Sequence, residues 1–222
     1  MKIEMSQGAW KETRTGVATV SWDNKTIHLD VPAIKNTKTG KIRVRLEDVA
    51  RVELETLARE AGIEPRDFPI LLVLKAQMGG FHNKEEVQFQ YHLNKMLFYQ
   101  WKEMEKLGLG ESFPHDEFKK ADRGPVPANI ESDLARLSGL GLISVERHRW
   151  GERPRDESKQ IKLTTKGSEL ANKFLRRTPE DLMATTAEVK AMIGTLPPPS
   201  VKEKVHREYP EFRTTYKVED SD

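Results

Sequence analysis

The sequence predicts an α+β fold in which a mostly helical winged helix-turn-helix domain follows a small antiparallel β-rich N-terminal region. Three observations predict it. Residues 123–167 show in succession a short apolar-striped segment, a Gly-Leu-Gly turn, a strand, a polar tip and a return strand, which is the order of elements in the second half of a winged helix. An apolar stripe at helical spacing covers residues 89–104, and strand-like alternation is found within the first 46 residues. We expect a β-rich region with one helix at residues 1–62, the winged domain at 63–213 and a flexible tail at 214–222.

The composition indicates a soluble protein with a highly charged surface. Charged residues make up 32% of the 222, yet 37 basic residues nearly balance 35 acidic ones, so any basic surface must be local. The absence of cysteine excludes disulfides, thiolate metal sites and a cysteine nucleophile. The N-terminus lacks the pattern of a signal peptide, and the longest apolar run, residues 68–74, is far shorter than the roughly 20 residues of a membrane helix. We therefore expect a cytoplasmic protein that does not associate with membranes.

The N-terminal region is predicted to contain three strands and a helix. Alternating apolar residues predict strands at residues 16–21 and 25–31, and Asp23-Asn24 between them is typical of a hairpin turn. A third strand is expected at residues 41–46, followed by a helix that ends at Gly62.

The third strand, this helix, a Gly-Ile turn and a second apolar helix resemble a ribbon-helix-helix unit over residues 41–76. Such a unit would insert Arg43 and Arg45 into a DNA groove. The alternative is that these arginines form the solvated face of an ordinary sheet strand.

Two longer helices are expected at the start of the winged domain. The first covers residues 68–77. The second is predicted to begin near Asn83, because Asn83 is a good N-cap and Glu85 and Glu86 would lie in the first turn, where the helix dipole favours acids. Its stripe indicates core packing rather than a cofactor site, and consists of Phe89, Leu93, Leu97, Trp101 and Met104.

The short helix of the winged segment is expected to start at Ala128 or Asn129 and to stop at Gly139-Leu-Gly141. Its apolar residues Ile130, Leu134 and Leu137 are predicted to face inward, with Glu131, Asp133 and Arg136 outward. Wing strands are expected at residues 142–145 and 160–163, with a tip at 150–158. Further helices are predicted at residues 164–177, at 178–193 and from an N-cap at Ser200 to His206.

Several short motifs in this order resemble the SocA-like antitoxin, or Panacea, domain. They are Lys95-Met-Leu-Phe-Tyr99, Arg123-Gly-Pro-Val-Pro127, Gly139-Leu-Gly-Leu-Ile143, Leu163-Thr-Thr-Lys-Gly167 and Tyr209-Pro-Glu-Phe212, within residues 68–213. The resemblance implies a helical domain related to winged helices that neutralises a partner toxin or acts as an adaptor, in some members alongside DNA binding. The sequence departs from the family pattern where His92 and Asn94 precede Lys95, and the N-terminal sixty residues lie outside the pattern.

No motif of a known enzyme class is present, neither a nucleophile elbow, a Walker loop, a dinucleotide fingerprint nor a His-Glu-x-x-His zinc helix. The six histidines are scattered, and His115-Asp-Glu117 is expected to be a solvated loop rather than a metal site, because three consecutive side chains on a turn diverge. We therefore expect a non-enzymatic protein without metal or cofactor.

The case for DNA rests on the wing, where residues 147–166 contain seven basic side chains against three acidic ones. Against it, Glu131 and Asp133 on the short helix would repel phosphates. Three interpretations of the wing remain open, namely DNA contact, a protein-binding surface and a solvated hairpin. The candidate DNA-binding residues are Arg123, Asn129, Ser132, Arg136, Arg147, Arg149, Trp150, Arg153, Arg155, Lys159, Lys162 and Lys166.

The leading hypothesis is a regulator that binds duplex DNA, as a homodimer, mainly through the basic wing. The alternative is an antitoxin or adaptor that binds a partner protein, a toxin or the target of a protease adaptor, through the winged domain.

Overall fold

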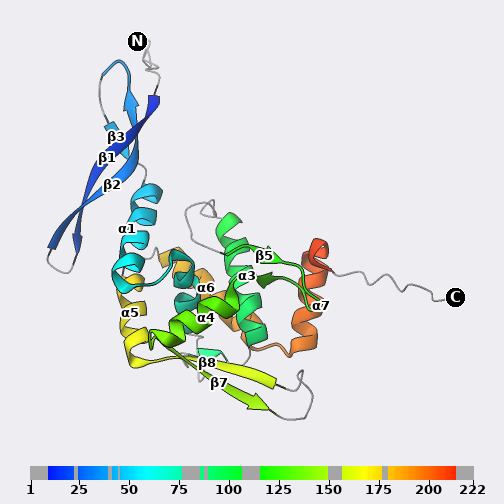
Figure 1. The fold of residues 1–222 in the computed structure, drawn as a ribbon. Coiled ribbons are helices and arrows are strands. Elements are labelled where there is room, and N and C mark those ends of the chain that lie inside the picture. The colour runs from blue at the N-terminus through cyan, green and yellow to red at the C-terminus, as the bar shows by residue number, and fades with distance from the viewer. Residues whose placement is uncertain are drawn as a thin grey trace.

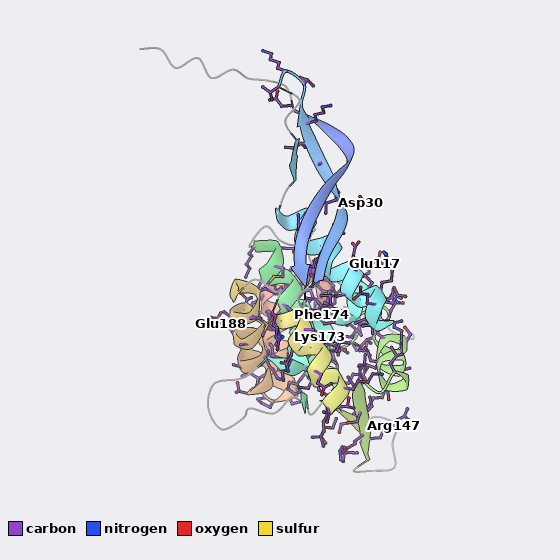
Figure 2. All side chains as sticks on the ribbon, turned by 90° about the vertical axis from the view of Figure 1, so that its left-hand side faces the viewer. Asp30, Glu117, Arg147, Lys173, Phe174 and Glu188 are labelled. Atoms are coloured by element: carbon purple, nitrogen blue, oxygen red, sulfur yellow. The ribbon has the colours of Figure 1, made fainter. Side chains whose placement is uncertain are left out.

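The computed structural model describes residues 10–22, 25–39, 42–44, 46–76, 86–87, 90–106, 116–149, 157–176 and 180–213 (Figure 1). The predicted α+β class is confirmed for this part of the chain, since helices form the body and the strands form small antiparallel sheets. One sheet lies at one end of the molecule, and the hairpin of another lies at the opposite end (Figures 1 and 2).

The N-terminal sheet has the order β1-β2-β3, built from β1 (Trp10–Trp22), β2 (Lys25–Asn36) and β3 (Ile42–Val44). The three strands were predicted, but β1 and β2 are longer than their apolar alternation suggested. They pair antiparallel along their whole length, from Trp22 opposite Lys25 to Trp10 opposite Asn36, with an irregularity between Thr13 and Gly16. Backbone hydrogen bonds of such a ladder do not require apolar side chains, so the polar ends remain paired. The predicted Asp23-Asn24 turn lies outside the described residues.

Helix α1 (Leu46–Ala61) joins this sheet to the body. Its residues Leu54, Leu57 and Ala58 are buried in the main core, and the helix also packs against β2, where Val31 and Ala33 are buried. The helix ends as predicted at Gly62, which has a φ of 69°, a left-handed conformation that glycine adopts without strain.

The body is organised around α2 (Phe68–Lys75), which follows the 3-10 turn η1 (Pro65–Asp67). Every residue of α2 from Phe68 to Leu74 is buried, as expected for a helix that is apolar on all sides. It contacts α3 (Gln90–Lys106), α5 (Thr165–Leu175) and α6 (Glu180–Gly194).

The C-terminal elements close the body beside α3. They are α7 (Pro198–Glu208) and the 3-10 turn η3 (Pro210–Phe212). Tyr209 and Phe212 pack edge-on against Phe98, with ring centroids 4.9 and 5.0 Å apart. The predicted N-cap at Ser200 is wrong, because α7 begins two residues earlier, where proline fits the first helical turn without losing a hydrogen bond.

A second sheet has the order β4-β8-β7, from β4 (Glu86–Val87), β7 (Ile143–Arg149) and β8 (Glu157–Leu163). The two wing strands are confirmed and extend further toward the tip than predicted. The helix start near Asn83 is wrong, because Glu86 and Val87 pair with Lys162 and Ile161 of β8 and α3 begins only at Gln90. The backbone of β8 supplies the pairing partners of Glu86 and Val87, and the sequence around these two residues gives no sign of that distant strand.

Helix α4 (Ile130–Gly139) precedes β7 and follows a small hairpin of β5 (Phe118–Lys119) and β6 (Val126–Pro127). The hairpin was not predicted, whereas the stop at Gly139-Leu-Gly141 is confirmed, with Gly141 at a φ of 67°. At the end of β8 the Thr164 hydroxyl accepts the amide N–H of Gly167 at 3.0 Å and caps α5.

Candidate nucleic-acid interface

The β7–β8 hairpin forms a projecting wing, and Arg147 lies on it beyond the helical body (Figure 2). Arg147 is exposed. The described chain places only the backbone of Arg149, and Trp150, Arg153 and Arg155 lie outside the described residues. Of the basic residues, Arg147, Lys159 and Lys162 lie on the described strands of the hairpin, and Lys166 lies in α5 just after β8.

Two of these lysines are joined to acids on neighbouring elements. Lys159 Nζ lies 2.7 Å from Glu131 Oε2 of α4, and Lys162 Nζ lies 3.3 Å from Glu146 Oε1 across the hairpin. Glu131 also accepts a 2.6 Å hydrogen bond from Gln90 Nε2. Burial raises the pKa of Glu131, but the hydrogen bonds from Lys159 and Gln90 outweigh it, so its pKa lies below the ordinary value. The wing is thus attached electrostatically to the first turn of α4.

Lys166 is held at the other end of α4. Its ammonium donates a 2.8 Å hydrogen bond to the carbonyl of Leu140, just after the helix ends. A main-chain carbonyl does not neutralise the ammonium, so this contact fixes the position of the charge without cancelling it.

The predicted base-contacting residues of α4 bond to nearby groups of the protein. Asn129 Nδ2 donates to Asp116 Oδ1 at 2.9 Å, and the Asn129 amide donates to Asp116 Oδ2 at 2.6 Å. Ser132 Oγ donates to the Asn129 carbonyl at 2.8 Å. Both side chains are exposed, as is Arg123 before the helix. To contact a base edge, Asn129 and Ser132 would each have to break a local hydrogen bond first, and both stay candidates on that condition.

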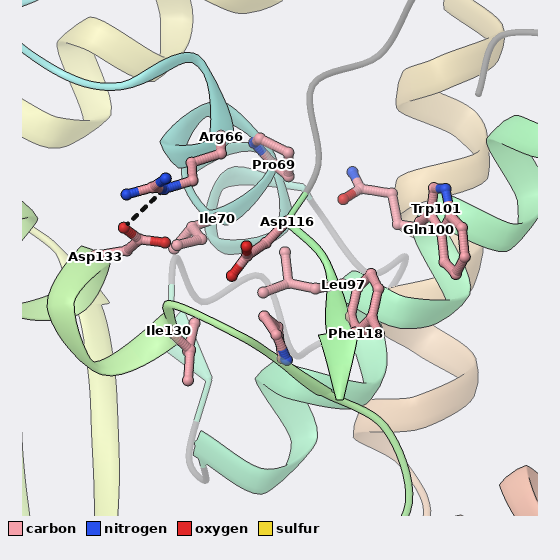
Figure 3. A pocket seen from close by; sticks show the side chains of 11 residues that line it. Arg66, Pro69, Ile70, Leu97, Gln100, Trp101, Asp116, Phe118, Ile130 and Asp133 are labelled. Carbon is pink, nitrogen blue, oxygen red and sulfur yellow. Dashed lines mark hydrogen bonds and ion pairs between the residues drawn. The ribbon is translucent and has the colours of Figure 1, made fainter. Parts of the chain in front are cut away.

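Asp133 was expected to face outward, and this prediction is wrong. The residue is 2% exposed and bonds to two arginines, with 3.1 Å from Arg66 Nε and 2.7 Å from an Arg136 guanidinium nitrogen (Figure 3 shows the Arg66 contact). The helical period explains the position, since residue 133 follows Ile130 by three and so lies on the apolar face. Two cations compensate the buried carboxylate.

Arg136 has a structural position in the same network. Its guanidinium binds both carboxylate oxygens of the buried Asp67, at 3.0 and 2.6 Å, and Asp67 also accepts the Glu64 amide at 2.9 Å. The hydrogen bond with Asp67 raises the pKa of Arg136 above its ordinary value. The fork-like geometry of guanidinium matches a carboxylate in this bidentate form. Arg136 therefore attaches α4 to the start of α2.

The cavity beside this network is too small for a substrate. It has a volume of about 20 Å³, close to the space of one water molecule, and lies among residues that include Arg66, Ile70, Leu97 and Phe118 (Figure 3). Within the described ranges no group of three histidine or acidic side chains could hold a metal ion, and none of the helices there is long and apolar enough to cross a membrane.

A larger groove of about 590 Å³ lies between the start of α3, the segment before β6 and the start of α4. Sequence reasoning did not single it out. Its lining includes Lys95, a fully buried lysine that looked like part of a short motif in an apolar helix. No local signal marks Lys95 as buried, because the elements that enclose α3 come from distant parts of the chain. The residues around the groove are Gln90, Tyr91, Asn94, Lys95, Ala121, Asp122, Arg123, Val126 and Glu131.

No protein-family model matches the sequence, and no curated protein matches it significantly. The resemblance to the SocA-like antitoxin domain therefore stays a prediction.

Proposed function

We propose that the protein is a non-enzymatic winged-helix regulator that binds duplex DNA through the β7–β8 wing and the exposed side of α4. The observation that carries the proposal is the order of elements. Helix α2, strand β4, helices α3 and α4 and strands β7 and β8 occur in the order expected of a winged helix, with the short β5–β6 hairpin inserted between α3 and α4, and β4 pairs with β8 in the sheet order β4-β8-β7. In that fold the helix before the wing lies along the major groove, and α4 holds this position.

The charge distribution supports the same proposal. Residues 147–166 have an excess of four positive charges, and much of this charge lies on a projecting hairpin, where it would neutralise DNA phosphates. The objection from Asp133 is weaker than the sequence suggested, since Asp133 is buried and paired with Arg136. Glu131 is paired with Lys159, so this lysine would have to leave Glu131 in order to contact a phosphate. Arg136 pairs with the buried Asp67, so it fixes the position of α4 and is not counted among the proposed DNA contacts.

Duplex titration at several salt concentrations tests the proposal. Each neutralised phosphate contributes roughly 0.9 to the slope of log affinity against log salt. We expect steep salt dependence for the wild type and a slope smaller by roughly one for Arg147→Ala. Arg59→Ala, at an exposed position on α1 and outside the wing, is the matched control and should leave the slope unchanged. Absence of duplex binding at low salt would sink the proposal.

The predicted tip provides an independent variant. Arg153→Ala with Arg155→Ala should weaken duplex binding further and leave the melting temperature unchanged, because charged side chains of a polar hairpin tip predicted from the sequence are expected to contribute little to folding. A dimer would present two wings to paired half-sites, so sedimentation of the complex on a palindromic duplex should give two chains per duplex.

A second candidate function, an antitoxin or adaptor that binds a partner protein, is favoured by a different feature. In the described sheet β1 is an edge strand of 13 residues at the end of the molecule opposite to the wing. An unpaired strand edge offers hydrogen-bonding groups to an incoming strand. Coexpression with the product of the adjacent gene tests it, and failure to purify a stoichiometric complex would count against this function.

A further inference from the structure

Glu131, at the start of α4, lies where three elements meet. Its Oε2 atom is 2.7 Å from Lys159 Nζ of β8, and its Oε1 atom accepts a 2.6 Å hydrogen bond from Gln90 at the start of α3. The Glu131 side chain is 67% exposed, whereas that of Lys159 is only 20% exposed. The carboxylate is therefore open to solvent, while most of the lysine side chain that it holds is covered.

The register of the wing brings a second cation to the same face of the hairpin. Arg147 of β7 is directly opposite Lys159 of β8 in the antiparallel ladder, and opposite side chains project from one face of a sheet. Burial raises the pKa of Glu131, but hydrogen bonds from Lys159 and Gln90 outweigh it. The charge of Arg147 lowers the pKa of Glu131 further. Glu131 is therefore ionised at neutral pH, and the charges of both wing cations act on it.

The groups around Glu131 are those that bind DNA phosphates in other proteins. Lysine, arginine and glutamine side chains donate to phosphate oxygens in protein–DNA complexes. A carboxylate and a phosphate group both offer anionic oxygens, so they compete for the same donors. The competition takes place at the junction of α4 and the wing, the two elements to which the proposed function assigns DNA contact.

We propose that Glu131 is an intramolecular competitor of DNA phosphate, so that the protein binds duplex DNA less tightly than its basic wing would allow. This inference rests on the proposed DNA binding. In the free protein the carboxylate occupies Lys159, and a phosphate group must displace it before the ammonium can contact DNA.

The effect of Glu131 is independent of the DNA sequence. Phosphate contacts position a protein on a duplex without reading its bases. Glu131 therefore weakens binding to any duplex and leaves discrimination between sequences to base contacts. Because an ion pair with an exposed member contributes little to folding, removal of the carboxylate should change DNA binding rather than stability.

Titration of a random-sequence duplex with the wild type and with Glu131→Gln tests the proposal. Glutamine keeps the size of the side chain and an oxygen acceptor for Gln90, but it has no charge with which to hold Lys159. We expect Glu131→Gln to bind about fivefold more tightly, the ratio that corresponds to the loss of one exposed ion pair. The slope of log affinity against log salt should become steeper by roughly 0.9, as for one additional phosphate contact.

Glu188→Gln is the matched control. It makes the same change in net charge at an exposed position of α6, well separated from Arg147 in Figure 2. This variant should leave the affinity and the slope unchanged. Equal gains from Glu131→Gln and Glu188→Gln would overturn the proposal, since the effect would then come from net charge alone.

Lys159 provides the test of the contact itself. If Glu131 acts by holding Lys159, most of the gain from Glu131→Gln should disappear in a protein that already contains Lys159→Ala. A gain of the same size in that background would show that the carboxylate acts only by repulsion at a distance, and the competition would be wrong. Circular dichroism and a melting curve of each variant establish that it is folded.

The same titrations separate this inference from the proposed function. If the wild type binds the duplex and Glu131→Gln binds it no more tightly, the proposed function stands and the inference fails. If neither protein binds the duplex at low salt, both fail. Tighter binding by Glu131→Gln that depends on Lys159 supports both.

Discussion

Lys190 and Lys95 are both fully buried lysines on neighbouring helices, α6 and α3, yet their surroundings differ. Lys190 Nζ donates to the carbonyls of Leu74 and Ala76, at 2.8 and 2.9 Å, at the C-terminal end of α2. Those carbonyls lack partners within the helix, and the helix dipole favours a cation there. Lys95 Nζ has one hydrogen-bond acceptor among the described residues, the Pro125 carbonyl. A buried charge whose hydrogen bonds the fold supplies stabilises the structure, whereas a buried charge with too few acceptors destabilises it.

The largest effect on stability is expected for Arg136, another cation whose charge is compensated within the fold. Arg136→Met leaves the carboxylate of Asp67, 0% exposed, without its bidentate partner. Breaking a buried ion pair on one side costs about 3–5 kcal/mol. Urea denaturation should show a loss of this size in the free energy of unfolding. The double variant Asp67→Leu with Arg136→Met should recover part of this loss. An exposed ion pair contributes at most about 1 kcal/mol, so a smaller loss for Arg136→Met would contradict the structural role of Arg136.

Lys190→Met should give the next largest effect. The substitution removes both hydrogen bonds to the end of α2 and leaves two buried carbonyls without donors. We expect a loss of about 2–4 kcal/mol in the free energy of unfolding. Lys173→Met on the exposed side of α5 is the control and should change stability little. Equal stability of Lys190→Met and Lys173→Met would contradict the stabilising role of Lys190.

Lys95→Met should raise the free energy of unfolding, whereas Lys190→Met lowers it, and the size of the increase should depend on pH. In the unfolded chain Lys95 has its ordinary pKa of 10.5, and burial lowers the pKa to about 7 in the folded protein. Between these values the unfolded state binds the extra proton, so the wild type gains stability as the pH rises from about 7 toward 10.5. Below about 7 the full destabilisation by the buried ammonium is present.

Thermal melts across that range should therefore show Lys95→Met more stable than the wild type at pH 7, with the difference shrinking as the pH rises. Other titrating groups cancel because both proteins contain them. A difference that does not depend on pH would show that Lys95 is neutral or compensated throughout. The charged or titratable groups that face Lys95 are Tyr91, Asp122, Arg123, Glu131 and His206.

The smallest effect concerns the wing. If duplex DNA is bound as proposed, Lys95→Met should leave the salt dependence of duplex binding unchanged, because a buried ammonium contacts no phosphate. Fluorescence anisotropy at several salt concentrations measures the slope. A slope smaller by about one would instead place Lys95 among the phosphate contacts.

Local signals predicted much of the body. Gly62 and the Gly139-Leu-Gly141 turn end helices as expected, because each has a conformation or spacing that is visible in a few residues. The same reasoning failed where the partner is distant in sequence. Glu86 and Val87 form a strand only because β8 lies beside them.

The candidate site follows the same rule. The basic wing could be found by counting charges, and its strands are where they were predicted. The inward position of Asp133 could have been found from its spacing to Ile130, but its two arginine partners could not. The surroundings of Lys95 depend on the segment before β6 and on the start of α4, neither of which is close to it in the chain.

Gly167 has a consequence for the direction of the wing. A side chain at this position would overlap the backbone carbonyl of Leu142, at the start of the wing, and no rotamer could relieve a clash with main-chain atoms. Substitution would separate the base of the hairpin from α5, and the angle at which the hairpin leaves the body would change. The junction between the hairpin and α5 therefore tolerates change along the hairpin strands more readily than at position 167.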